Sequence, residues 1–209
     1  MEVPSNILSI ISRINQSENN WKAIFMAIWQ HSEKIKSHFQ NTGEWNKKIS
    51  FQLPLSKNNV EHYYTPYQLY SILTSRDGEF TIGHLLTLFS LFEDLLNQSS
   101  KILCSSELTT SKWENMKNFF KEDKTKDILF INEINELNLA KKTRNCYIHT
   151  GGKIDSEWIK AYKEVKGDPI VSIGDELNKG FPNIFHQIEE WNELIMKISS
   201  RIKTKIENL

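Results

Sequence analysis

The amino-acid sequence predicts an all-α protein, a helical bundle of about seven helices with at most a short β-type segment near 170–173. Apolar residues recur at steps of three and four along most of the 209 residues, which is the period of an amphipathic helix. The sequence contains no internal repeat and no low-complexity tract. The β-type run Ile170–Ile173 is too short to form a sheet alone. One helical bundle is therefore the economical interpretation.

Helix boundaries near the N-terminus follow from residues that favour helix starts and stops. A first helix is expected from Pro4-Ser5, and a second from Asn19-Asn20 to the stop at Asn41-Thr42-Gly43. Residues 44–65 show little periodicity. We expect them to form an irregular loop with an extended piece around Ile49–Leu53.

The most apolar helix of the first half follows this loop. A short helix is expected from Thr65-Pro66, where proline suits the first helical turn, to Asp77-Gly78. The next helix, about 81 to 104, has a wide apolar face and is expected at the centre of the bundle. Glu93 lies in the middle of it.

The second half of the chain is also predicted to be helical. One helix is expected to begin at Ser111 and another to cover about 128 to 149. A short helix should begin at Asp155 or Ser156. In the last helix, about 182 to 207, apolar residues recur at alternating steps of four and three, which is typical of a seam that packs on another helix.

No break in composition marks a domain boundary in the sequence. We therefore expect a single domain over residues 1–209. Within it, a core at about 80–209 should contain the functional motif described below, and residues 1–79 should form an elaboration on that core.

Charge and composition exclude several classes of protein. The 26 Lys and Arg residues balance the 26 Asp and Glu residues, so the formal net charge is zero. Proteins that bind nucleic acid by bulk electrostatics are usually basic, so any RNA site here must rely on local positive charge. A hydrophobic content of 39% and a charged content of 25% do not fit a collagenous, disordered or membrane protein.

Signals for export, membrane insertion and metal binding are absent from the sequence. The N-terminus lacks the basic and apolar regions of a signal peptide, and no apolar run approaches the ~18 residues of a membrane-spanning helix. Cys104 and Cys146 form no CxxC pair, and no Cys/His cluster has zinc spacing. We expect a cytoplasmic protein with free thiols, without a metal site, a cofactor or a membrane partner.

One segment combines residue types that suit phosphodiester chemistry. Arg144 is followed at once by Asn145 and, five positions on, by His149, at the end of a late helix and just before Gly151-Gly152. Histidine exchanges protons near neutral pH, and a fork-shaped guanidinium suits a phosphate. RNA carries its own nucleophile, the 2′-hydroxyl, so a base and a phosphate clamp are the groups that its cleavage needs.

This segment resembles the signature of the HEPN superfamily, in which an arginine, a polar residue and three further residues precede a histidine. The order of elements from about residue 80 onward also resembles that of HEPN proteins, whereas the first 65 residues or so resemble no family that we can name. The resemblance implies a metal-independent endoribonuclease that acts on RNA as a homodimer with a composite active site. The family is frequent in toxin and antiviral defence systems, which admits an operon-encoded regulatory or antitoxin protein as a further partner.

The resemblance also implies roles for individual residues. His149 would be the general base, with its dimer mate as the acid, and Arg144 would bind the scissile phosphate. Asn145 would position the reacting groups. The family often has a polar or acidic residue on a facing helix, and Glu93 is expected there, although its neighbour Asp94 is not separated from it by periodicity.

Local positive charge before the motif comes from Lys141 and Lys142, which are expected to bind RNA. A toxin subgroup of the family has a tyrosine two residues after the histidine, which a nucleotidyltransferase partner modifies. Gly151 occupies that position here, so this regulation is not expected.

The chemistry of metal-free RNA cleavage favours a dimer, as the resemblance also implies. On a helix, Arg144 and His149 differ by roughly 140° in direction and ~7.5 Å in rise, although a long arginine can reach round. Because the helix ends near His149, the direction of the imidazole is left open. One chain offers one motif histidine, so an acid for the leaving oxygen would come from a second copy. The last helix and the 81–104 helix are the expected dimer faces.

Two simpler interpretations stay open at this stage. The chain could be a non-catalytic HEPN module for RNA binding or protein interaction, which its neutral charge favours. Arg144 and His149 could also be surface cations at a helix C-terminus, where positive charge is favourable, and the two lysines could be solvated.

Overall fold

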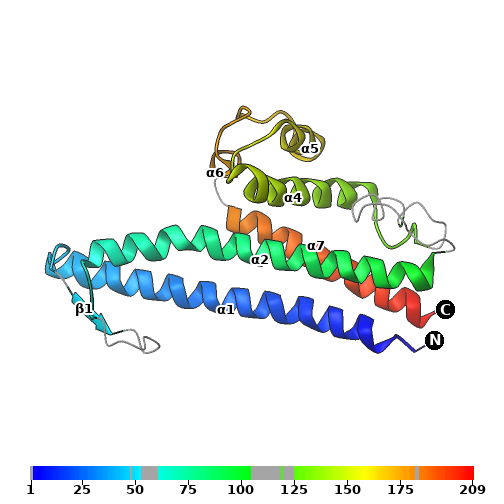
Figure 1. Cartoon of the computed structure of the whole chain (residues 1–209), viewed down its shortest axis with the longest axis horizontal. Helices are drawn as coiled ribbons and strands as arrows, with labels where there is room; N and C mark the ends of the chain where they lie inside the picture. The colour runs from blue at the N-terminus through cyan, green and yellow to red at the C-terminus, as the bar shows by residue number, and fades with distance from the viewer. Residues whose placement is uncertain (1, 48, 53–60, 105–118, 120–124, 182–183) are drawn as a thin grey trace. The chain divides into compact units, whose positions relative to one another are not determined.

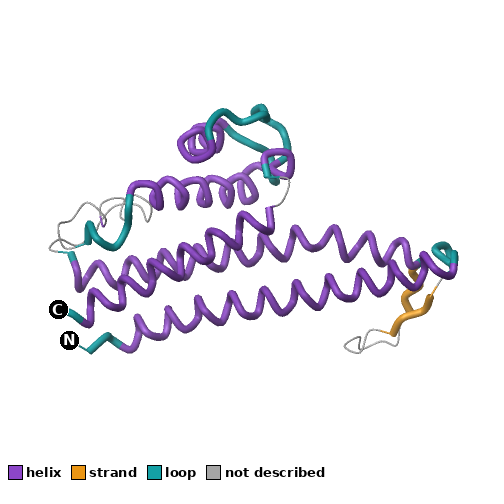
Figure 2. Tube along the Cα trace, turned by 180° about the vertical axis from the view of Figure 1, so that it is seen from behind, coloured by secondary structure: helices purple, strands orange, loops and turns teal. Residues whose placement is uncertain are grey.

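The computed structural model describes residues 2–47, 49–52, 61–104, 119, 125–181 and 184–209, and gives only the backbone of 49–52, 61–64 and 69–80. Helices dominate it, as Figure 2 shows, so the prediction of an all-α bundle is confirmed. The described elements in chain order are α1 (Ser5–Thr42), β1 (Ile49–Gln52), β2 (Glu61–Tyr64), α2 (Pro66–Leu103), α4 (Ile131–Thr150), α5 (Ser156–Lys166), α6 (Leu177–Gly180) and α7 (Ile184–Glu207).

Two pairs of expected helices are each one continuous helix. Helix α1 continues through Asn19-Asn20, and α2 continues through Asp77-Gly78. Asparagine favours caps and glycine costs about 1 kcal/mol within a helix, but neither prevents helix formation as proline does. The helix expected after Ser111 lies outside the described residues, apart from Phe119.

The β structure lies in a different place from the one expected. Strands β1 and β2 form an antiparallel hairpin in which Ile49 pairs with Tyr64 and Gln52 with Glu61, so the extended piece near 49–53 is confirmed. At 170–173, where the sequence allows at most a short β-type segment, no strand forms. Ile170 and Ile173 are exposed, and neither belongs to a strand. A β-branched run needs a partner strand, and no described strand pairs with this one.

The chain forms two compact units. Unit 1 contains residues 1–19 and 82–209, and unit 2 contains residues 20–81. The expected core at about 80–209 thus corresponds to most of unit 1. The N-terminal elaboration is divided, because the first 19 residues belong to unit 1 and the remainder forms unit 2.

The core of unit 1 is built on α7, as the isoleucine spacing indicates. Ile188, Ile195, Ile198 and Ile202 are completely buried. Helix α2 contributes a second buried stripe, of Leu85, Leu88, Phe89, Phe92 and Leu95. Both apolar faces are therefore used inside the unit.

Hydrogen bonds fix the directions of the helices in unit 1. The start of α1 lies antiparallel to α2, because Asn6 donates to Gln98 at 3.2 Å and Ser17 lies 3.2 Å from the His84 ring nitrogen. Helix α4 lies antiparallel to α7 (Figure 1). Arg201, late in α7, donates to Glu133 at 2.7 Å, whereas Trp191, earlier in α7, donates to Glu136 further along α4 at 3.1 Å.

Aromatic side chains join α5 and α6 to this pair. The Trp158 ring lies 4.8 Å from that of Tyr162 and 5.4 Å from that of Phe181, measured between centroids. The indole N–H of Trp158 donates to the Thr143 hydroxyl on α4 at 3.0 Å. A buried polar group that is satisfied in this way fixes α5 against the end of α4.

We predict that Gly180→Ala destabilises the fold. A Cβ atom at Gly180 would lie 2.7 Å from Cη2 of the fully buried Trp158, so the indole or the backbone must shift. Overpacking of this kind costs about 1–3 kcal/mol, which urea denaturation would measure. Gly83→Ala is the control, because a Cβ there meets nothing within 4 Å and a helical alanine is favourable. Equal stabilities of the two variants would contradict the prediction.

We also predict a loss of stability in mild acid that depends on His84. Burial lowers the pKa of His84 from 6.5 to about 4, although the Asn192 amide and the Glu18 carboxylate oppose this shift. Ser17 is a further polar neighbour, because its hydroxyl lies 3.2 Å from Nδ1 of His84. Because the folded-state pKa is lower than the unfolded-state value, the stabilisation is complete above the unfolded pKa and is lost as the pH falls toward the folded one. The urea midpoint should fall more between about pH 7 and pH 5 for wild type than for His84→Gln; parallel profiles would contradict this.

Candidate functional site

The candidate site lies at the C-terminal end of α4, which ends at a pair of glycines. Gly151 and Gly152 have φ values of +62° and +86°, which favour glycine and cannot continue the helix. The Gly152 N–H donates to the Cys146 carbonyl at 3.0 Å, and the Leu177 N–H donates to the Gly152 carbonyl at 2.9 Å. The helix end is therefore tied both to its own last turn and to the start of α6.

Arg144 is held partly inside unit 1. Its side chain is half-buried, and its Nε atom is buried without a hydrogen-bond partner. No carboxylate of the described residues forms an ion pair with it. Arg144 follows the buried residues Leu137 and Ala140 by two turns and one turn of α4, so it begins on the buried side of the helix. A buried guanidinium N–H without an acceptor is unfavourable, and because Nε itself is out of reach of solvent, an anion would contact the partly exposed remainder of the Arg144 side chain.

His149 and Asn145 lie on one side of the last turn of α4. The two residues are four apart and share a helix face, with Asn145 half-buried and His149 exposed. Within the part of the chain that the structure describes, neither side chain has a hydrogen bond or an ion pair. These two polar groups are thus available to a ligand.

The structure corrects one geometric expectation. Helix α4 continues through Thr150, so the direction of His149 is set by helical geometry after all. Arg144 and His149 differ by roughly 140° around the helix and make no direct contact within one chain. The motif therefore presents two separate polar groups rather than one assembled site.

Burial separates the two acids on α2 that the sequence could not distinguish. Glu93 is 7% exposed, whereas Asp94 is exposed. No described hydrogen bond or ion pair joins Glu93 to a residue of the motif, so its expected role in facing Arg144 and His149 stays a prediction.

The two lysines before the motif differ in their surroundings. Lys142 forms an ion pair with Glu157 on α5 at 3.3 Å, and Lys160 binds the other oxygen of that carboxylate at 3.1 Å. These two lysines lower the pKa of Glu157, Lys160 more strongly. Lys141 is half-buried. RNA binding by Lys142 would therefore compete with the ion pair that holds α5 against α4. The two residues of this pair are 15 positions apart, and no local sequence pattern predicts such a contact.

The cysteine within the motif is not activated. Cys146 is fully buried, and burial raises the pKa of its thiol to about 11. Because the thiolate is the reactive form, this side chain is not suited to nucleophilic attack.

The expected dimer faces are largely buried within one chain. The isoleucine seam of α7 and the apolar stripe of α2 from Leu85 to Leu95 form the core of unit 1. Near the motif, the exposed apolar side chains are instead Ile148, which is 46% exposed, and Ile170 and Ile173 in the loop between α5 and α6. Residues 153 and 176 pair across this region, which connects that loop to the end of α4.

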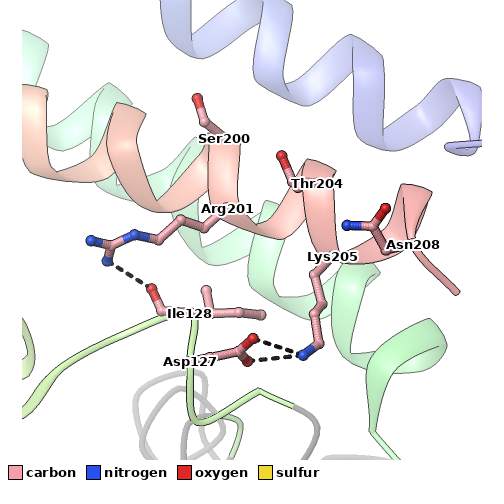
Figure 3. A pocket seen from close by; sticks show the side chains of 7 residues that line it. All are labelled: Asp127, Ile128, Ser200, Arg201, Thr204, Lys205 and Asn208. Carbon is pink, nitrogen blue, oxygen red and sulfur yellow. Dashed lines mark hydrogen bonds and ion pairs between the residues drawn. The ribbon is translucent and has the colours of Figure 1, made fainter.

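A separate pocket of about 300 Å³ lies at the other end of α4 (Figure 3). Its cations are already paired within the chain, because Arg201 binds the Ile128 carbonyl and Glu133, and Lys205 binds Asp127 at 2.8 Å. Glu133 and His149 are separated by ~24 Å along the helix axis. This pocket is therefore not part of the motif. No sequence pattern marks Arg201 as a structural residue.

Neither metal-binding nor membrane-spanning features occur in the described ranges. No group of three or more His, Cys, Asp or Glu residues there is arranged to hold a metal ion. No helix there is long and apolar enough to cross a membrane.

Comparison with known proteins found no similarity. No family model, no curated protein and no solved structure matches this chain. The residues of the motif and their geometry are therefore the basis for any functional proposal.

We predict that Cys146 resists alkylation in the folded protein. Burial and a raised thiol pKa both suppress the reaction, so iodoacetamide near pH 8 should modify Cys146 only slowly. Mass spectrometry of peptides would follow the label, and modification in denaturant provides the control. Rapid labelling of Cys146 without denaturant would show that the thiol is accessible.

Proposed function

We propose that this protein is a metal-independent endoribonuclease of the HEPN type, with Arg144 and His149 as its catalytic residues. The observation that carries the proposal is the half-buried guanidinium of Arg144, whose Nε lacks a partner. Arg144 lies in the last two turns of α4, and the same helix carries the exposed His149, which has no described partner.

The reaction uses the nucleophile of the substrate. His149 removes the proton from a 2′-hydroxyl, and the oxygen attacks the adjacent phosphorus. The bond from phosphorus to the 5′-oxygen breaks, which leaves a 2′,3′-cyclic phosphate and a 5′-hydroxyl. Arg144 stabilises the negative charge on the non-bridging oxygens, and Asn145 orients the imidazole or the phosphate from the same helix face as His149.

The leaving 5′-oxygen needs a proton donor, and a second copy supplies it in this proposal. Within one chain, Arg144 and His149 point in directions roughly 140° apart, so a single motif does not surround one phosphate. The His149 of a partner copy would act as the acid. Ile148, Ile170 and Ile173 provide exposed apolar surface near the motif at which two copies can meet.

The biological setting follows from the resemblance to the HEPN superfamily. A ribonuclease of this type would act as a toxin or in antiviral defence, and an operon-encoded regulatory or antitoxin protein would restrain it. Glu93 and Lys141 would support the reaction from α2 and from the preceding turn of α4.

A non-catalytic role is the second candidate, and two observations favour it. The formal net charge is zero, and Lys142 is engaged with Glu157. In this case the helical bundle would bind RNA or a protein without cleaving it, and His149→Ala would leave binding unchanged.

We predict that the purified protein cleaves RNA in excess EDTA and that His149→Ala and Arg144→Ala each lose most of this activity. General acid–base catalysis contributes about 10²–10⁴-fold, so the loss for His149→Ala should lie in that range. Cleavage would be measured on mixed cellular RNA, with detection of 2′,3′-cyclic phosphate ends.

The matched controls are His186→Ala and Arg13→Ala, which remove an exposed histidine and an exposed arginine elsewhere. Both should retain wild-type activity, and circular dichroism should show that all variants fold. Intact RNA with every protein would support the non-catalytic role. Equal cleavage by wild type and both motif variants would place the activity outside the motif.

A further inference from the structure

A stripe on α1 in unit 2, exposed at its centre and half-buried at its two ends, has the pattern of a self-complementary surface. Lys22, Met26, Trp29 and Glu33 follow one another at steps of four, three and four, so they lie within roughly 60° of one another on the helix. Met26 is 57% exposed and Trp29 is 55% exposed. An exposed tryptophan next to an exposed methionine is unusual for a surface that only water covers.

The stripe is distinct from the side of α1 that packs within unit 2. Trp21, Ser32 and Phe39 are buried and share one direction, which differs from that of the stripe by roughly 100°. Met26 and Trp29 are therefore not turned outward by a local distortion of the packed face. They are presented by a regular, well-formed helix.

The order of the four residues indicates which surface covers the stripe: a second copy of α1. Lys22 and Glu33 lie at equal distances from a midpoint between Ala27 and Ile28, and Met26 and Trp29 share the same midpoint. A second copy of α1 placed antiparallel about this midpoint puts Met26 against Trp29 of the copy, twice. The same placement puts Lys22 opposite Glu33 of the copy, also twice, which is the reciprocity that a two-fold interface requires.

We propose that the chain self-associates through this stripe, with two copies of α1 packed antiparallel about the midpoint between Ala27 and Ile28. The tryptophan and methionine provide the apolar contact, since sulfur packs favourably on aromatic rings and tryptophan is enriched among residues that dominate interfaces. The charges at the two ends of the stripe set the register. The Glu33 carboxylate also accepts a hydrogen bond from Lys36 of its own chain at 3.5 Å. This bond is compatible with an ion pair to Lys22 of the second copy, because a carboxylate accepts several donors.

This interface goes beyond the proposed ribonuclease activity and does not depend on it. It involves residues of unit 2 alone, whereas the catalytic motif lies in unit 1. A failure of RNA cleavage would therefore leave the self-association unaffected, and the two proposals are tested by different measurements.

The first experiment is sedimentation velocity of the full chain over a concentration series. Wild type should self-associate as its concentration rises, and Trp29→Ala should weaken this association on the order of tenfold or more, whereas a dimer through the motif would be insensitive to this substitution. Ile24→Ala is the matched control, because Ile24 is 44% exposed on the same helix but points roughly 140–160° away from Met26 and Trp29. Wild type that stays monomeric, or a dimer that Trp29→Ala leaves unchanged, would overturn the proposal.

A charge swap tests the register directly. Lys22→Glu alone places two acids opposite each other, and Glu33→Lys alone places two lysines opposite each other, so each should weaken the dimer. The double variant restores opposite charges and should recover the wild-type equilibrium to within about threefold, the usual scale of a surface ion pair. Lys22 and Glu33 are too far apart to pair within one helix. Failure of the double variant to recover association would refute the antiparallel arrangement.

Discussion

The burial of α7 inside unit 1 is the constraint on which the position of the motif depends. Ile188, Ile195, Ile198 and Ile202 are inaccessible to solvent, so the helix cannot shift or rotate without exposing apolar surface that costs about 25 cal/mol for each Å². Helix α4 is then aligned on α7 by polar contacts at Glu133 and Glu136. The Thr143 hydroxyl on α4 accepts a hydrogen bond from the Trp158 indole, and the glycine pair after Thr150 ends α4 at a defined point. His149 and Arg144 thus occupy directions that the core has already set.

Much of the fold follows from the sequence because the relevant signals are local and strong. The alternating steps of the last helix predict its buried seam, and Gly151-Gly152 predicts the end of α4 within one residue. The predictions fail where a local sequence preference is too weak to decide the structure alone. Asn19-Asn20 can cap a helix, but in α1 the helical hydrogen bonds continue across it. Ile170–Ile173 has β propensity, but a strand requires a partner, and sequence propensity does not provide one.

The candidate site is less predictable because its properties come from contacts between distant residues. The motif identifies Arg144 and His149, yet the buried Nε of Arg144 depends on how α4 is packed. Glu93 and Asp94 differ by one position, and only tertiary burial distinguishes them. The pairing of Lys142 with Glu157 likewise requires α5 to return beside α4, which the pattern of lysines does not encode.

Glu133 has a consequence for how the protein folds. The same carboxylate accepts the Phe130 N–H at the start of α4 and the guanidinium of Arg201, which is 68 residues away. Burial raises the pKa of Glu133, but the hydrogen bonds from Arg201, Phe130 and Lys197 together outweigh burial. The net effect lowers the pKa below its usual value, so the carboxyl is held as an anion. Helix initiation at this end of α4 and the docking of α7 are therefore stabilised by one group, and local and long-range order form together. Since nucleation is the costly step of helix formation, the ion pair that docks the C-terminal helix also supports the first turn of the helix that carries the motif.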